Sequence, residues 1–141
     1  SFSTIDDAVA KIFEPGATPP TLRLETLKLA VKENFLTGVS MMPMIPYVSD
    51  KTESLNDMFT AFKAAGANYV MPASITLFGN GPSDSKTLVL RAIEKHYPHL
   101  TEKYKKLFVN SHELPSYYNK AFYKKMLELG EEYKLRNRIL Q

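Results

Sequence analysis

The chain has 141 residues and a mass of 16.0 kDa, which fits one compact domain and is short for two. Its 44% hydrophobic and 23% charged residues are typical of a globular protein and exclude a disordered one. No apolar run approaches the roughly 20 residues that cross a bilayer, and the N-terminus lacks the basic-then-apolar pattern of a signal peptide. The sequence therefore predicts a cytoplasmic protein with no membrane partner.

Two further counts limit the chemistry. The chain has no cysteine, which excludes disulfides, thiolate zinc sites, iron–sulfur ligation and a cysteine nucleophile within it. Residues 1–85 carry 6 Lys and Arg against 9 Asp and Glu, whereas residues 86–141 carry 12 against 6. The basic second half is compatible with a phosphate-bearing partner, although solvated helix faces account for such lysines more often.

The first third of the chain alternates between extended and helical patterns. Ser1 is followed at once by the apolar Phe2 and a Ser-Thr-Ile run, so Ser1–Ile5 indicates the end of a strand and suggests a fragment of something longer. Asp6–Phe13 predicts a short helix, ended by Glu14-Pro15-Gly16. Thr21 is a plausible N-cap for a second helix that continues to Asn34.

The middle of the chain predicts a strand, a helix and another strand. Phe35–Met44 is almost continuously apolar, as in a parallel strand that is covered on both faces. Asp50 and Glu53 resemble a capping box and open a helix to Ala65, with Gly66 as its C-cap. Asn68–Leu77 predicts the next strand, and its internal Pro72, which has no N–H, indicates an edge or a functional strand end.

The remainder is helical. The pattern predicts helices from Ser83 or Ser85 to Tyr97, over Leu100–Phe108 and over Pro115–Tyr133. The whole is an α/β fold of about three parallel strands with crossover helices, an incomplete barrel or sheet followed by a C-terminal helical extension. We expect the α/β part to span residues 1–82 and the basic extension residues 83–141.

Candidate site residues lie where the predicted strands end, because ligands of parallel α/β folds bind at the carboxyl ends of strands. Hydroxyls end the first and third strands, and Met-rich Met42-Pro43-Met44 ends the second. This combination suits a ligand with a ribose and an adenine, although the methionines are equally compatible with plain core packing. Asp6, Asp7 and Glu14 cluster after the first strand. The three histidines favour surface positions, and Gly79-Asn80-Gly81 favours a turn over a phosphate loop.

A connected series of short motifs runs through nearly the whole chain. It comprises Ser1–Ala17 (SFSTIDDAVAKIFEPGA), Arg23-Leu24-Glu25, Thr37–Asp50 (TGVSMMPMIPYVSD), Ala64–Ala67 (AAGA), Leu77–Pro82 (LFGNGP) and the Lys- and Tyr-rich tail. The series resembles the middle and C-terminal parts of radical SAM enzymes of the spore photoproduct lyase-like group, also called DNA repair photolyase-like radical SAM proteins.

The resemblance implies a partial (βα)6 barrel, of which this chain supplies about the last three strands. Enzymes of the group hold a [4Fe–4S] cluster with a CxxxCxxC loop and cleave S-adenosylmethionine (SAM) reductively to a radical. Because this chain has no cysteine, the cluster half is expected upstream of Ser1 or is absent. The resemblance further implies SAM contacts at Ser3, in the Met41-Met42-Pro43 region, with Met41 and Pro43 beside the adenine, and at Ser74.

These observations leave three functions open. The first is a fragment of a radical SAM enzyme that contributes part of the SAM and substrate surface, needs the upstream part of the polypeptide and is inactive alone. The second is a non-catalytic module that binds nucleic acid or an acidic partner through Lys103, Lys105 and Lys106. The third is a piece of another (βα) barrel enzyme, which the lack of Lys or His at the strand ends disfavours. An exposed first strand would also pair two copies at Ser1–Ile5.

Overall fold

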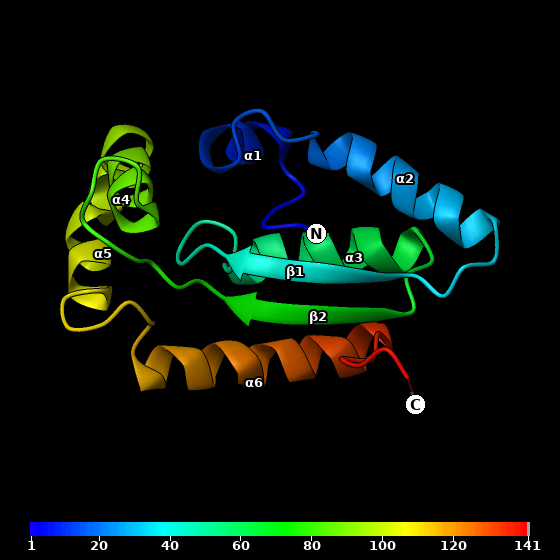
Figure 1. The fold of residues 1–141 in the computed structure, drawn as a ribbon. Helices are drawn as coiled ribbons and strands as arrows, with labels where there is room; N and C mark the ends of the chain where they lie inside the picture. Colours follow the sequence, from blue (N-terminus) through cyan, green and yellow to red (C-terminus); the bar gives the residue numbers. More distant parts are fainter. Residues whose placement is uncertain (141) are drawn as a thin grey trace.

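The computed structural model describes residues 1–140, and within these residues it is a helical protein around one small parallel sheet (Figure 1). None of its helices combines the length and apolar character that a membrane crossing needs. The elements are α1 (Asp7–Phe13), α2 (Pro20–Lys32), β1 (Gly38–Met44), α3 (Thr52–Ala64), β2 (Tyr69–Ser74), α4 (Ser85–His96), the 3-10 turn η1 (Pro98–Leu100), α5 (Thr101–Leu107) and α6 (Ser116–Tyr133).

The sheet is a single βαβ unit. Strands β1 and β2 are parallel and pair from Gly38↔Tyr69 to Met41↔Pro72, and α3 connects them and covers one face (Figure 1). A glycine is needed at position 38 because a Cβ there would lie 2.2 Å from the Tyr69 ring, which crosses it. Pro72 lies in an edge strand, as the sequence predicted, since both strands of a two-stranded sheet are edges.

The expected partial barrel of three parallel strands is wrong, because residues 1–140 contain only two strands. Ser1–Ile5 does not form a strand, although the Phe2 N–H donates one hydrogen bond of 2.8 Å to the Ser40 carbonyl of β1. Side chains hold this segment instead: Arg23 Nη1 donates to the Ser1 carbonyl at 2.7 Å, and Thr4 Oγ1 accepts from the Asp6 N–H at 3.0 Å. The α/β mixture itself is compatible with the structure.

Two helix starts also differ from the predictions. The residue before α2 is Pro19 rather than Thr21, and the Thr21 hydroxyl donates to Asp7 of α1. The cap position of α3 is Lys51 rather than Asp50, so the predicted capping box is wrong. The C-cap of α3 is Ala65 rather than the predicted Gly66, which follows the cap in a left-handed conformation with a φ of 86° and donates its N–H to the Lys63 carbonyl at 3.0 Å.

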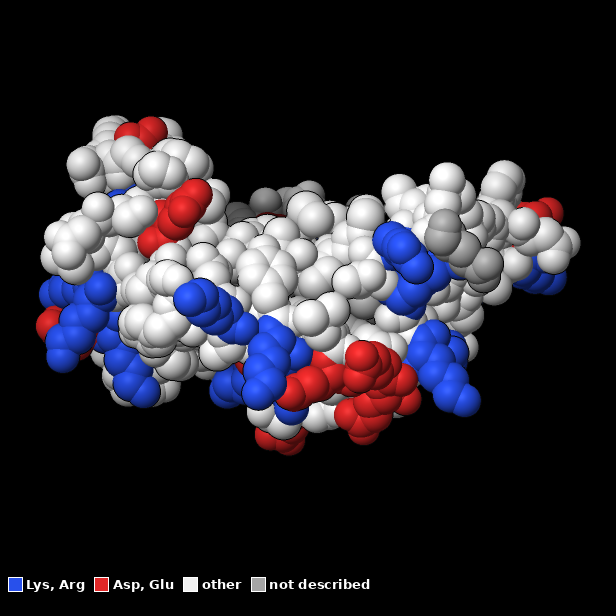
Figure 2. Space-filling model, turned by 90° about the horizontal axis from the view of Figure 1, so that it is seen from below, with Lys and Arg blue, Asp and Glu red and all other residues white. Residues whose placement is uncertain are grey.

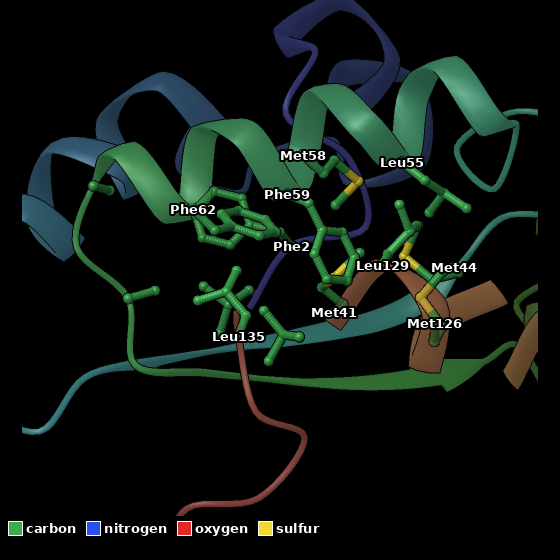
Figure 3. Close-up of a cluster of buried hydrophobic side chains, with 14 of the residues drawn as sticks. Phe2, Met41, Met44, Leu55, Met58, Phe59, Phe62, Met126, Leu129 and Leu135 are labelled. Carbon is green, nitrogen blue, oxygen red and sulfur yellow. The ribbon is translucent and has the colours of Figure 1, made fainter. Parts of the chain in front are cut away.

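The larger hydrophobic core lies between the sheet, α3 and α6 (Figure 3). It joins sequence-distant segments, because α6 packs beside both α3 and β2. The N-terminal segment contributes Phe2, whose ring centroid lies 5.0 Å from that of Phe62. Its other main members are Met41 and Met44 of β1, Leu55, Met58, Phe59 and Phe62 of α3, Phe122, Met126 and Leu129 of α6, and Leu135.

A second hydrophobic core lies at the carboxyl ends of the strands, where α4 and α5 pack (Figure 1). Ile45 and Val48 follow β1, Ile75 and Leu77 follow β2, and these side chains meet the buried face of the two helices. The helical part of the chain therefore covers much of the end of the sheet where the sequence predicts a ligand. The members of this second core on α4, α5 and the flanking turns include Ile93, Leu100, Tyr104, Leu107 and Phe108.

Candidate functional site

Of the four residues that the resemblance implies as SAM contacts, Pro43 and Ser74 are accessible at the carboxyl ends of β1 and β2. Pro43 is exposed and Ser74 is half-buried, and the pair Met44↔Ser74 ends the strand register. Met41 is fully buried in the larger core, so its side chain packs inside the protein and is not accessible to a ligand. The neighbouring Met42 is 37% exposed, because side chains alternate between the two faces of a strand.

The fourth residue, Ser3, belongs to a polar network beneath the N-terminal segment. Ser3 is 2% exposed, and its hydroxyl donates to Glu14 Oε1 at 3.2 Å. Arg23 Nη2 donates to Glu14 Oε2 at 2.6 Å, and its guanidinium lies over the Phe2 ring, 5.4 Å from the centroid. Ser3 and Glu14 are therefore brought together, but Asp6 caps α1 by accepting from the Ala8 N–H at 2.8 Å.

The chain contains no thiolate ligand, so it does not fit the [4Fe–4S] cluster of the radical SAM group. Within residues 1–140, no three His, Asp or Glu side chains come together as a metal site requires. The glycine-rich stretch forms a turn, as predicted, in which the Gly81 N–H donates to Asp84 Oδ2 at 2.7 Å. That carboxylate closes the turn and leaves no cradle for a phosphate.

A cluster that the sequence did not predict lies in the loop after β1. We call Tyr47, Asp50 and Tyr118 the Asp50 cluster. One Asp50 oxygen accepts from the Tyr47 N–H at 2.7 Å, and the other accepts from the Tyr118 hydroxyl. The rings of the two tyrosines meet edge to face, with centroids 5.6 Å apart. The cluster thereby fastens α6 to the end of β1.

The backbone of this loop is strained at Tyr47, whose φ of 61° is rare for a bulky residue. The bond to Asp50 holds that conformation in place. Lys103 Nζ lies 4.9 Å from the centroid of the Tyr47 ring, and a cavity of about 300 Å³ with Lys51 and Lys125 in its lining adjoins the cluster. The hydroxyl of Tyr104 on α5 ties the loop to that helix by donating a buried hydrogen bond to the Pro46 carbonyl at 2.6 Å.

Burial changes the titration of these groups. Burial raises the pKa of the Asp50 carboxyl above its ordinary value of 3.8, although the hydrogen bond from Tyr118 opposes the shift. Burial, together with the adjacent Asp50, raises the pKa of Tyr118 far above its ordinary value. Burial likewise raises the pKa of Tyr104. Both tyrosines therefore stay protonated and act as donors at physiological pH.

The raised pKa of Asp50 predicts a pH dependence of stability. Between its ordinary value of 3.8 and its raised folded value, the folded state binds more protons than the unfolded state, so stability falls as pH rises through this window. We expect the free energy of unfolding of the wild type, relative to Asp50→Asn, to decrease from pH 4 upward in urea titrations. Asp57→Asn, at an exposed position of α3, is the control. A wild-type advantage that grows with pH would contradict the prediction.

Of the Asp50 cluster, the sequence singles out Asp50 itself and gives no signal for its contact with Tyr118. Asp50 stands before a helix, where a carboxylate usually caps the helix, so the local pattern predicts a capping box there. Its actual partner, Tyr118, is 68 residues away on α6, and nothing local identifies that contact. Tyr118 falls within the predicted helix over Pro115–Tyr133, which gives it no particular partner.

Comparisons with known proteins add no identification. No protein-family model matches the sequence, and searches of curated proteins and of solved structures found no match.

Proposed function

We propose that this chain is the C-terminal portion of a cytoplasmic radical SAM enzyme and contributes part of its SAM and substrate surface. The observation that carries the proposal is the accessible surface that remains at the carboxyl ends of the strands, beside the part that α4 and α5 cover. Met42, Pro43 and Ser74 are accessible there, and in Figure 1 no helix within residues 1–140 crosses the face opposite α3. This is the end of a parallel sheet where α/β proteins bind ligands.

In this proposal the cluster is held by an upstream part of the same polypeptide. The edge of β1 beside the N-terminal segment supports this, because within residues 1–140 no strand pairs with that edge and the Phe2 N–H donates to its Ser40 carbonyl. The cluster would supply the electron for SAM cleavage from that upstream part, and the residues of this chain would supply only contacts to the ligand. A second copy of the chain could use the same edge, and sedimentation distinguishes a dimer from a monomer.

The direct test is SAM titration of the 141-residue chain with labelled methionine methyls, observed by NMR. We expect millimolar SAM to shift the methyl resonance of Met42, while the buried methyl of Met58 on α3 stays unchanged. Ser74→Ala is expected to weaken binding, and Ser116→Ala, at the exposed start of α6, is the matched control. The chain alone should not cleave SAM. An unchanged Met42 resonance at saturating SAM would refute the proposed surface.

The alternative is a module that binds nucleic acid. Its support is α5, which exposes Lys103, Lys105 and Lys106 while burying Tyr104. Two of these lysines are engaged, since Lys103 lies over Tyr47 and Lys105 Nζ contacts Glu102 at 2.9 Å. Figure 2 shows basic side chains in separate groups with acidic ones among them rather than one continuous basic surface.

The alternative has its own measurement. Binding of a short DNA duplex that weakens steeply with salt, and that is lost when Lys103, Lys105 and Lys106 are changed to glutamine, would favour the module over the enzyme portion. Lys11→Gln, at an exposed position on α1, is a control for the loss of one charge elsewhere. If the wild-type chain does not bind the duplex at low salt, this alternative is excluded.

A further inference from the structure

A cavity of about 720 Å³ lies away from the strand ends, between the outer edge of β2 and α6. We call it the β2–α6 pocket. Its size falls within the range of about 300–1,000 Å³ that small-molecule sites occupy. The residues that carry the argument are Val70 and Pro72 of β2, Tyr123 and Met126 of α6, and Lys134 and Arg136 after α6.

The chain closes one end of the pocket by turning back sharply after α6. Lys134 adopts a left-handed conformation with a φ of 54°, which ends the helix. Gly130 permits the return, because a Cβ there would lie only 3.0 Å from the Leu135 carbonyl oxygen. The returning segment then joins the edge of β2, where the Val70 N–H donates to the Arg136 carbonyl at 2.9 Å. This end wall is therefore built by backbone geometry rather than by mobile side chains.

A second contact closes the outer edge of β2 beyond the carboxyl end of the strand. Thr76 forms an isolated antiparallel bridge with Glu113, and the Leu77 N–H donates to the His112 carbonyl at 2.7 Å. Only a few residues of β2 therefore remain unpaired between the two closures, and one of them is Pro72, which has no N–H to donate. The edge is too short for a bound peptide strand, and this favours a small molecule as the occupant.

The lining combines apolar walls with a cationic end. Met126 is buried at the base, whereas Tyr123 is 42% exposed and Leu127 is 55% exposed along the opening. The charged residues of the lining are two cations, Lys134 and Arg136, and one carboxylate, that of Glu131. Within residues 1–140 neither cation forms a salt bridge, and Arg136 Nε is buried without a hydrogen-bond partner although its Nη2 donates to the Ile139 carbonyl at 2.8 Å.

We propose that the β2–α6 pocket binds an amphipathic carboxylate. The apolar body of the ligand lies against Tyr123, Met126 and Leu127, which removes apolar surface from water. Its carboxylate accepts hydrogen bonds from Arg136 and Lys134, because a guanidinium matches the geometry of a carboxylate. The site is independent of the strand-end surface proposed for SAM, since none of Met42, Pro43 and Ser74 lines it.

The test uses decanoate as the probe, below its micelle-forming concentration, with the full chain and labelled methionine methyls. Decanoate is expected to shift the methyl resonances of Met71 and Met126, which line the pocket, and to leave that of Met42 unchanged. Decanol, which has the same body without the charge, should bind at least tenfold more weakly. Equal affinity for the two molecules, or no shift at Met71 and Met126, would overturn the proposal.

Three variants define the roles of the residues. Arg136→Gln should weaken decanoate binding at least tenfold and leave decanol binding unchanged, whereas Arg138→Gln, two residues along and outside the lining, should change neither. Leu127→Glu places a charge at an exposed wall position and should weaken both molecules. Wild-type affinities retained by both Arg136→Gln and Leu127→Glu would reject the pocket. If Arg136→Gln fails to fold, the wild-type comparison of decanoate with decanol still decides.

Discussion

Replacing Phe59 with alanine is expected to lower the free energy of unfolding by about 3–5 kcal/mol. Phe59 is fully buried on α3, and its ring centroid lies 5.6 Å from that of Tyr133 on α6. The substitution removes a large apolar group and leaves a cavity at the point where α3 and α6 meet. Urea denaturation followed by circular dichroism measures the loss, which is a large fraction of the stability of a domain of this size.

Leu22→Ala on α2 is the control for Phe59→Ala, because Leu22 is 57% exposed and its truncation creates no cavity. We expect its effect to stay within about 0.5 kcal/mol. Limited proteolysis adds a second readout, since loosening this contact should make α6 more susceptible to cleavage. Equal losses for the two variants would show that α3 and α6 do not share a core in solution.

Replacing Arg23 with methionine should cost about 2 kcal/mol, less than a fully buried ion pair because both partners are about a fifth exposed. Methionine keeps much of the packing against Phe2 but removes the bonds to Glu14 and to the Ser1 carbonyl. Glu14 is then left partly buried without its cation, and the partner of the Ser3 hydroxyl loses its orientation. Urea denaturation at neutral pH measures the effect.

A double-mutant cycle with Glu14→Gln isolates the contribution of the pair. The double variant should lose less stability than the sum of the two single variants, because the second change removes the unpaired charge that the first one creates. The control is Lys28→Met, which breaks an exposed pair with Glu25 and should cost less than about 0.5 kcal/mol. Strict additivity would mean that the Arg23–Glu14 contact contributes nothing to stability.

Local signals predicted the helices better than the strands. The predicted helix over 6–13 corresponds to α1, which Asp6 caps, whereas the cap residues predicted for α2 and α3 are wrong. The predicted strand over 35–44 is shorter in the structure and begins at Gly38. The Phe35 N–H donates to the Ala30 carbonyl of α2 at 3.1 Å, and Thr37 bonds to both the N–H and the side chain of Asn68, which precedes β2. Strand ends depend on such pairing partners, and apolar patterns do not reveal them.

The structure tests where the proposed site residues lie and not what they bind. Pro43 and Ser74 lie at neighbouring strand ends, which the register of β1 and β2 brings together, and their contact with SAM stays a prediction. The resemblance also implies a contact from Met41, but alternation along β1 turns that side chain into the core. The Asp50 cluster and the β2–α6 pocket escaped prediction altogether, because both depend on where α6 packs.

The absence of cysteine, the charge asymmetry and the order of the helices and strands after Ser1–Ile5 were determined by the sequence alone, since each depends on composition or on short-range patterns. Only the tertiary structure decided that Ser1–Ile5 stays outside the sheet, that α6 shares the core of the first half and that Asp50 meets Tyr118. The physical reason is that burial and long-range hydrogen bonds compete with local preferences. Wherever Arg23, Tyr118 or α6 offers a partner across the fold, that partner overrides the local pattern.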